Sequence, residues 1–413
     1  MEPVKGLFKK GAIIVVLGDG GVGKTTLAAA LGMAAARTGF DTGLITVDPA
    51  RRLRDALGLE HLSARPRRLD SRRLRAAGLH PQLKLAAMVV DVKRTWDELV
   101  GRFVKSDGAR QRILDNPFYR NLTERFAGAE SYAALEQLYE LHSSGRFDVE
   151  IVDTPPVPQA LDFIEAPSHL MRLFDPQMMR WLSLSSSFAV RNGSRLIGRA
   201  GRFVLGHLES FAGVKMLTAA SEFFATANQA VCDLNARFCR IESLLRSPAL
   251  HFVLVTTAEE DRLREARDLA FRMERQGLQL SAVVINRMLE EGMAVDLAAT
   301  PRTLAPELGE ALALRLTLAD EIPRGGGVDA LVHHLESYAA ERLARAERVA
   351  RFAQSLPADL TLAIMPDIDI GVRDLQALSR LSVLMADATA GRTQESERRE
   401  PQADSTRRRV RLP

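Results

Sequence analysis

The chain has 413 residues, of which 46% are hydrophobic and 26% are charged, a balance that is ordinary for a globular protein with a substantial core. No apolar run approaches the roughly 18–20 residues that are needed to span a bilayer, which argues against a membrane-spanning protein. The net charge of +4 is mild, so it gives little support to nucleic-acid binding.

The first apolar run, 12–17, follows Lys9 and Lys10 and superficially resembles the core of a signal peptide. The run is too short for that role, and it leads into glycines rather than into a cleavage site. The two cysteines, Cys232 and Cys239, argue against a disulfide framework and suit a reducing compartment. We therefore expect a cytoplasmic protein.

Short apolar runs bounded by turn residues predict buried parallel strands. They cover residues 12–17, 43–47, 149–152, 252–256, 282–285 and 362–365, with a weaker candidate at 85–90. Helical patterns lie between the runs, for example at 25–37 and 258–276. This alternation predicts an α/β fold, with a mostly parallel sheet and helices on both faces.

Two stretches without strand signals, at about 94–141 and 165–248, predict helical insertions into one domain that spans residues 1–386. Cys232 and Cys239 lie within the second stretch, two helical turns apart, and we predict that they are buried structural thiols. Residues 387–413 are polar and lack aromatic side chains, which predicts a disordered basic tail.

Residues 18–26 read Gly-Asp-Gly-Gly-Val-Gly-Lys-Thr-Thr, and they follow a predicted strand and open a predicted helix. They satisfy the phosphate-binding pattern G-x-x-x-x-G-K-[ST] in its required context. Small residues let backbone N–H groups turn toward phosphate oxygens, and the start of the helix adds a favourable dipole. Lys24 is placed to reach the β- and γ-phosphates, and Thr25 to put its hydroxyl on Mg²⁺. The predicted nucleotide-binding stretch is Gly20, Gly21, Val22, Gly23, Lys24, Thr25 and Thr26.

The same glycines also fit the dinucleotide fingerprint G-x-G-x-x-G, with Asp48 at the position of a ribose-binding acid. Two features favour the phosphate-binding loop instead. The dinucleotide fingerprint does not require Lys24 or the threonines after it, whereas the phosphate-binding loop does. The apolar strand 149–152 also ends at Asp153, as the second element of such a nucleotide site requires.

Asp48 and Asp153 each follow a predicted strand, at the sheet edge where ligands of open α/β sheets bind. Alone, either residue is more typical of a turn or a helix cap. On one edge with the phosphate-binding loop, the two carboxylates are better explained as a catalytic pair. One can orient the attacking water, and the other can hold Mg²⁺ through its water shell. The predicted Mg²⁺ site consists of Thr25, Asp48 and Asp153, with both carboxylates reaching the ion through water.

These motifs resemble those of the ArsA-type ATPases, which include the arsenite-pump ATPases and the ATPases that target tail-anchored membrane proteins. The resemblance rests on the glycine-rich loop, on residues 46–50 and on residues 152–156. Ile285-Asn286-Arg287 and Met365-Pro366 agree with it. It covers roughly residues 10–385 and is strongest for the bacterial anion-transporting-ATPase-like branch.

The resemblance implies a P-loop NTPase of the deviant Walker-A (SIMIBI) class that uses ATP and Mg²⁺. It implies that Asp48 activates water and that Asp153 lies near Mg²⁺. By the same resemblance, Asn286 hydrogen-bonds adenine and Pro366 packs on the base. The guanine-binding pattern N-K-x-D is missing, which favours ATP over GTP.

The chain departs from the family at two points. Asp19 occupies the position of a lysine that usually reaches across a dimer to the partner's nucleotide, and the C-x-x-C pair of the targeting relatives is absent. A carboxylate beside a triphosphate is unfavourable unless it points away or is paired. We therefore expect Asp19 to face a partner subunit.

The leading hypothesis is an ATPase that works as a nucleotide-gated dimer, either a homodimer or a heterodimer with a related ATPase. Its work would be coupled to a membrane anion pump or to a hydrophobic client. Methionines suit adaptable client surfaces, although core packing explains them equally well. They are Met171, Met178, Met179 and Met216. The alternatives are a weakly active regulatory subunit beside a lysine-bearing paralogue, and a partition or positioning ATPase. No nucleic-acid partner is expected.

Overall fold

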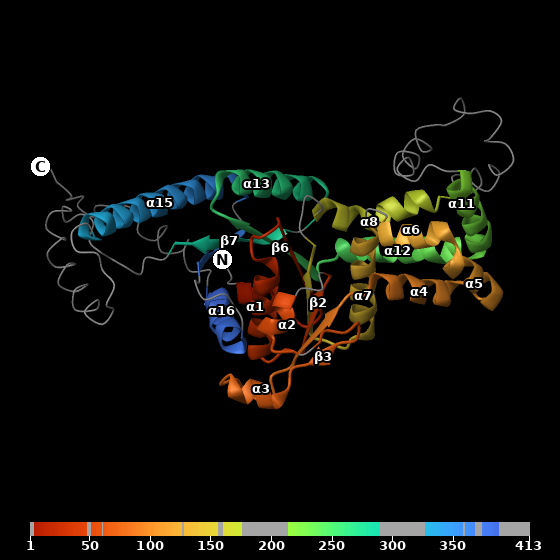
Figure 1. Ribbon diagram of the computed structural model, residues 1–413, viewed down its shortest axis with the longest axis horizontal. Coiled ribbons are helices and arrows are strands. Elements are labelled where there is room, and N and C mark those ends of the chain that lie inside the picture. The colour runs from red at the N-terminus through yellow and green to blue at the C-terminus, as the bar shows by residue number, and fades with distance from the viewer. Residues whose placement is uncertain are drawn as a thin grey trace, which may run out of the picture.

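The computed structural model describes residues 4–47, 51–59, 61–125, 128–155, 160–175, 214–278, 280–289, 327–357, 360–367 and 374–387. Within these residues the chain forms an 8-stranded sheet with helices on both faces (Figure 1). A group of helices extends from one end of the sheet. The expected α/β architecture is confirmed, while residues 388–413, the greater part of the predicted tail, lie outside the described residues.

The strand order is β3-β4-β2-β5-β1-β6-β7-β8. All neighbours pair in parallel except β3, which runs antiparallel to β4. The strands are β1 (Ala12–Gly18), β2 (Thr42–Thr46), β3 (Arg67–Arg68), β4 (Leu85–Val89), β5 (Val149–Asp153), β6 (Leu250–Thr257), β7 (Leu280–Met288) and β8 (Thr361–Pro366). Each run predicted from the sequence is confirmed as a strand. The short edge strand β3 was not predicted because its two exposed arginines carry no apolar pattern.

Strand β1 is apolar throughout because helices cover both of its faces. Along β1, Ile13, Val15 and Leu17 join the core on one face, whereas Ile14 and Val16 join the core on the other. Side chains of a strand alternate between faces, so a run without polar residues is buried on both sides. The run that forms β1 was recognisable for this reason.

The face that carries Ile14 and Val16 is covered by α1 (Lys24–Arg37), with α2 (Arg51–Ala56), α3 (Ser71–Ala76) and α16 (Leu375–Asp387) around it. A short 3-10 helix, η1 (Val4–Leu7), also contacts α16. Helix α1 is rich in alanine, which lets the sheet and α16 approach it closely. The loop after β1 leads directly into this packed helix.

The second face is covered by α13 (Glu260–Arg275) and α15 (Gly327–Ser355) near β6 and β7. Farther along the sheet lie the helices of a helical lobe, which Figure 1 shows beyond β2. Its elements are α4 (Val92–Phe103), α5 (Asp107–Asp115), α6 (Pro117–Arg125), α7 (Ala129–Ser144), α8 (Ala160–Leu173), α11 (Val214–Ala227), the 3-10 turn η3 (Asn228–Ala230) and α12 (Val231–Leu245).

The helical lobe draws its elements from both predicted insertions, and these share one core. Phe118 of α6 packs against Phe223 and Phe224 of α11, with ring centroids 5.3 and 5.5 Å apart. Met171 and Met216 are partly buried against this core. They therefore act in packing, whereas Met178 and Met179 lie outside the described residues.

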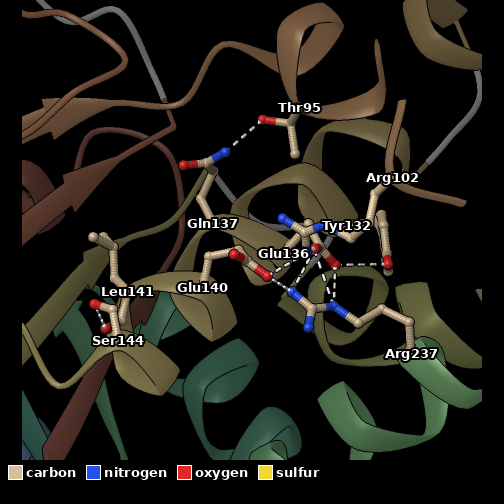
Figure 2. Close-up of polar contacts among 9 residues, drawn as sticks. All are labelled: Thr95, Arg102, Tyr132, Glu136, Gln137, Glu140, Leu141, Ser144 and Arg237. Carbon is tan, nitrogen blue, oxygen red and sulfur yellow. Dashed lines mark hydrogen bonds and ion pairs between the residues drawn. The ribbon is translucent and has the colours of Figure 1, made fainter. Parts of the chain in front are cut away.

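A buried polar network joins three helices of the lobe (Figure 2). Arg237 of α12 donates from Nη2 to Oε1 of Glu136 at 2.6 Å and also pairs with Glu140. The hydroxyl of Tyr132 donates to Oε2 of Glu136 at 3.0 Å, and Arg102 of α4 pairs with Glu140. Arg237 thereby links the second insertion to α7 of the first, and Glu140 extends the network to Arg102 of α4.

The two cysteines are both free and exposed, so the prediction of buried thiols is wrong. On α12 the buried positions Val231, Phe238 and Leu245 recur every seven residues. Cys232 and Cys239 each follow one of these positions and therefore lie about 100° farther round the helix. Their common spacing places them on one exposed face.

No helix in the described ranges combines the length and the apolar character that crossing a membrane requires.

Arg67 and Arg68, which belong to the arginine-rich stretch before α3, are exposed. Arg68 forms an ion pair with Asp41 at 2.7 Å.

Glu150 gives the fold a pH-dependent contact between α7 and β5. Its carboxylate is buried in the sheet, with Oε2 2.8 Å from Nδ1 of His142. Burial raises the pKa of the Glu150 carboxyl above its ordinary value of 4.5, against the opposing effect of His142. A carboxyl whose pKa is raised on folding stabilises the protein below its unfolded pKa, and this contribution is lost as the pH rises through the folded pKa.

We therefore expect the free energy of unfolding of wild type to fall relative to Glu150→Gln as the pH rises above about 4.5. Urea unfolding of both proteins, at intervals between about pH 4 and pH 7, measures this difference. Glu124→Gln, at an exposed position of α6, controls for the loss of one carboxylate. A difference between wild type and Glu150→Gln that does not change with pH would contradict the expectation.

Candidate phosphate-binding site

Within the described residues, Asp153 and the start of the glycine-rich loop lie at the carboxyl ends of parallel strands, along one edge of the sheet. The register aligns Asp153 of β5 with Val16 of β1 and with Thr46 of β2. On the other side of β1, Gly18 is aligned with Val255 of β6. Ligands of open α/β sheets bind at this edge.

The loop between β1 and α1 has a backbone that requires glycine. Gly21 and Gly23 have φ angles of 79° and 97°, in the left-handed region that other residues rarely adopt. At Gly18, an added Cβ would lie 2.3 Å from the carbonyl oxygen of Val255, so β6 approaches the loop too closely for a side chain. Such a compact turn before a helix directs successive N–H groups into one concavity, which suits an anion.

Lys24 is the first residue of α1 and is buried with its ammonium group folded back over the loop. Its Nζ donates to the carbonyl oxygen of Asp19 at 2.8 Å. This contact places a cation across the concavity formed by the glycines. Thr25 and Thr26 follow in the first turn of α1 and are half-buried.

Asp153 is fully buried at the end of β5, the strand beside β1. Oδ2 of its carboxylate accepts a hydrogen bond of 2.9 Å from Oγ1 of Thr46 on β2. The next residue, Thr154, donates from its hydroxyl to the carbonyl oxygen of Val16 at 2.8 Å. Two neighbouring strands thus orient this carboxylate and the backbone that follows it.

The donor set is suited to a magnesium ion. Mg²⁺ prefers oxygen ligands and retains part of its water shell. Thr25 supplies a hydroxyl beside the loop, and Asp153 supplies a carboxylate on the adjacent strand. Asp48, the other predicted ligand, lies outside the described residues, although Thr46 and Val47 lead to it from the end of β2.

Asn286 contacts the loop directly. It is aligned with Thr257 near the end of β7, and its Nδ2 donates to the carbonyl oxygen of Val22 at 2.7 Å. An added Cβ at Gly23 would lie 2.4 Å from the same nitrogen. In this structure, therefore, Asn286 supports the loop backbone.

Pro366 is farther from the loop than Asn286. It ends the outer strand β8, which is separated from β1 by β6 and β7. Its partner in the sheet is Met288, whose carbonyl oxygen accepts a hydrogen bond of 2.7 Å from the N–H of Asp367.

Asp19 forms an ion pair with Arg262 of α13, within the same chain. The expectation that Asp19 faces a partner subunit stays a prediction, because only contacts within one chain are described. Oδ1 of Asp19 also accepts a hydrogen bond of 2.6 Å from the N–H of Gly20. The pairing removes the physical reason for that expectation, because the negative charge is offset by a cation in the chain itself.

Thr46 and Arg262 are site residues that the sequence analysis did not assign. Thr46 ends a strand in the motif that leads to Asp48, so its position was visible but its bond to Asp153 was not. Arg262 lies in a helix of alternating charges, where several arginines look alike. Its role depends on tertiary packing, for which the sequence carries no local signal.

Comparison with known proteins agrees with this arrangement. The sequence model of the family described as "Anion-transporting ATPase" matches residues 11–299. The "Putative arsenical pump-driving ATPase 1" of Aquifex aeolicus is 23% identical over 290 residues, which cover 68% of this chain and 64% of that protein. "ATPase GET3" of Malassezia globosa is 25% identical over 275 residues, covering 66% of this chain and 71% of that protein.

An uncharacterized protein of Streptomyces coelicolor is 29% identical over 291 residues, covering 68% of this chain and 64% of its own. The match therefore spans a little less than two thirds of the Aquifex and Streptomyces proteins. The family match covers more than half of the chain, includes the loop and extends through the strands that surround it. This chain belongs to the anion-transporting ATPase family and has the α/β fold of a P-loop NTPase.

Proposed function

We propose that the chain is a Mg²⁺-dependent ATPase that binds ATP in the loop between β1 and α1. The observation that carries the proposal is the placement of Lys24. Its buried ammonium group crosses a glycine-rich loop at the start of a helix, beside the strand that ends in Asp153. A triphosphate supplies the charge that such a cation and such N–H groups bind.

The chain's own residues divide the work of the reaction. The loop N–H groups and Lys24 would bind and orient the phosphates and stabilise negative charge that develops on them. Thr25 and Asp153 would hold Mg²⁺, which supplies further charge neutralisation when bound. Asp48 would orient the attacking water and accept its proton. Thr46 keeps the Asp153 carboxylate directed along the sheet edge.

We further propose that ATP gates a dimer, and that the helical lobe handles a hydrophobic client or a membrane anion pump. The family membership supports this proposal, because the names of relatives include an arsenical pump-driving ATPase and ATPase GET3. The lobe is linked to the site through α7, which contacts both β2 and β5. This contact gives a route by which a movement of β2 or β5 would reach the lobe.

Asn286→Ala is expected to weaken the binding of both ATP and inorganic tripolyphosphate, each by about fivefold. The reason is that Asn286 donates to the loop carbonyl of Val22, and one hydrogen bond is worth roughly 1 kcal/mol. Calorimetric titration of each ligand into wild type and variant measures the effect. A loss confined to ATP would instead assign Asn286 to the adenine, as the family resemblance implies.

The test of the proposed function is Asp48→Asn. The variant should bind ATP with the affinity of wild type, because no phosphate contact is lost. Its turnover should fall by on the order of 10²–10⁴, the usual contribution of a general base. Nucleotide titration and steady-state phosphate release on the same preparations separate the two effects. Loss of binding with normal turnover per bound ATP would make Asp48 structural, and the assignment would be wrong.

A further inference from the structure

The proposed site contains a charge that should oppose its ligand. Asp19 begins the loop directly after β1, and Lys24 closes the loop over the backbone carbonyl of the same residue. A carboxylate there adds negative charge where a triphosphate brings several more. Like charges about 5 Å apart repel strongly even at an effective dielectric constant of about 20.

Arg262 provides a counter-charge from outside the loop. It lies in the first turns of α13, and its guanidinium group pairs with the carboxylate of Asp19. Its backbone carbonyl accepts a hydrogen bond of 3.1 Å from Oγ1 of Thr256, which is buried near the end of β6. The base of the arginine is therefore fixed to the strand next to β1.

Packing alone does not hold the Asp19 carboxylate in this place. The residue borders a cavity of about 270 Å³ between the loop, β6 and α13, whose lining includes Thr256, Arg262 and Glu265. The side chains of Asp19 and Arg262 are 25% and 37% exposed, so the pair is partly shielded from solvent. A partly shielded ion pair is screened less than one on the open surface.

We propose that Arg262 is a positioning residue for nucleotide binding. Its guanidinium group offsets the charge of Asp19 and holds the Asp19 carboxylate against α13. This inference rests on the proposed binding of ATP to the loop. In this role Arg262 acts through Asp19 and needs no contact with the nucleotide. Removing Arg262 should therefore be harmful only while Asp19 keeps its charge.

The test is a double-mutant cycle on ATP affinity. Arg262→Ala should weaken ATP binding by about tenfold, because the Asp19 charge is left uncompensated beside the phosphates. Asp19→Asn keeps the hydrogen bond to Gly20 and should bind within about twofold of wild type. In the Asp19→Asn/Arg262→Ala double variant, affinity should return to within about twofold of wild type.

Two further measurements show whether the loss of affinity in Arg262→Ala is electrostatic. The loss in Arg262→Ala should be larger for ATP than for ADP, because ATP carries more charge, and it should shrink as the salt concentration rises. Arg264→Ala, an exposed arginine of the same helix, is the matched control and should bind ATP like wild type. If Arg262→Ala does not fold, Arg262→Gln removes the charge with less change of volume and carries the same test.

The outcomes separate this inference from the function on which it rests. Wild type that binds no ATP overturns both. If wild type and Arg262→Ala bind ATP with equal affinity, the role of Arg262 is overturned and the proposed function is not. Weak binding by Arg262→Ala that Asp19→Asn fails to rescue also overturns it, because the arginine then supports the fold rather than the charge balance.

Discussion

Lys24→Ala is expected to weaken ATP binding by at least about 100-fold. The substitution removes the buried cation that lies across the loop, together with its hydrogen bond to the carbonyl oxygen of Asp19. Hydrogen bonds to charged groups are each worth about 1.5–3 kcal/mol, and every 1.4 kcal/mol is a factor of about ten in affinity. Because Lys24 is placed to contact two phosphates, the losses combine.

Calorimetric titration of ATP into both proteins measures this change. Lys105→Ala, which removes an exposed lysine between α4 and α5, is the matched control and should leave the affinity unchanged. Thermal unfolding without nucleotide shows whether the variant remains folded. A folded Lys24→Ala protein that binds ATP as tightly as wild type would show that the loop is not the nucleotide site.

Arg237→Ala is expected to lower the free energy of unfolding by about 3–5 kcal/mol, the usual cost of removing one partner from a buried ion pair. The side chains of Arg237 and Glu136 are 8% and 3% exposed. Without the arginine, the Glu136 carboxylate has to remain buried beside Tyr132 with its main counter-ion gone (Figure 2). Glu140 loses a partner as well, although Arg102 still pairs with it.

Chemical denaturation measures this loss, with Arg240→Ala on the exposed side of α12 as the control. The control should change stability by less than about 0.5 kcal/mol. Because Arg237 joins α12 to α7, the variant should also expose the helical lobe to protease before the sheet. Equal stabilities of Arg237→Ala and Arg240→Ala would mean that the network contributes nothing to the lobe.

The sheet and the loop were predictable from the sequence because their signals are local. A strand that is covered on both faces reads as a nearly continuous apolar run, as β1 does along its whole length. The loop needs glycines at defined positions for its backbone, and it needs a lysine at the helix start. The conformation at Gly23 and the position of Lys24 could therefore be predicted from a few neighbouring residues.

The features that escaped prediction depend on residues far apart in the chain. The sequence indicates two helical insertions but not their common core, which Phe118 and Phe224 build together. The pairing of Asp19 with Arg262 joins the first strand to a helix of the second half of the chain. The cysteines were placed wrongly for a different reason, because the spacing of residues does not show which face of a helix is buried. Cys232 and Cys239 each lie one position after a buried residue of α12 and are therefore exposed.

The central claim is that this chain hydrolyses ATP at the loop that contains Lys24. Steady-state release of phosphate from ATP tests it most directly, measured for wild type and Lys24→Ala with Mg²⁺ and with excess chelator. We predict release by wild type with Mg²⁺, and only background release by wild type with chelator and by Lys24→Ala in either condition. Release by Lys24→Ala at the wild-type rate, or no release by wild type with Mg²⁺ at any protein concentration, would contradict it.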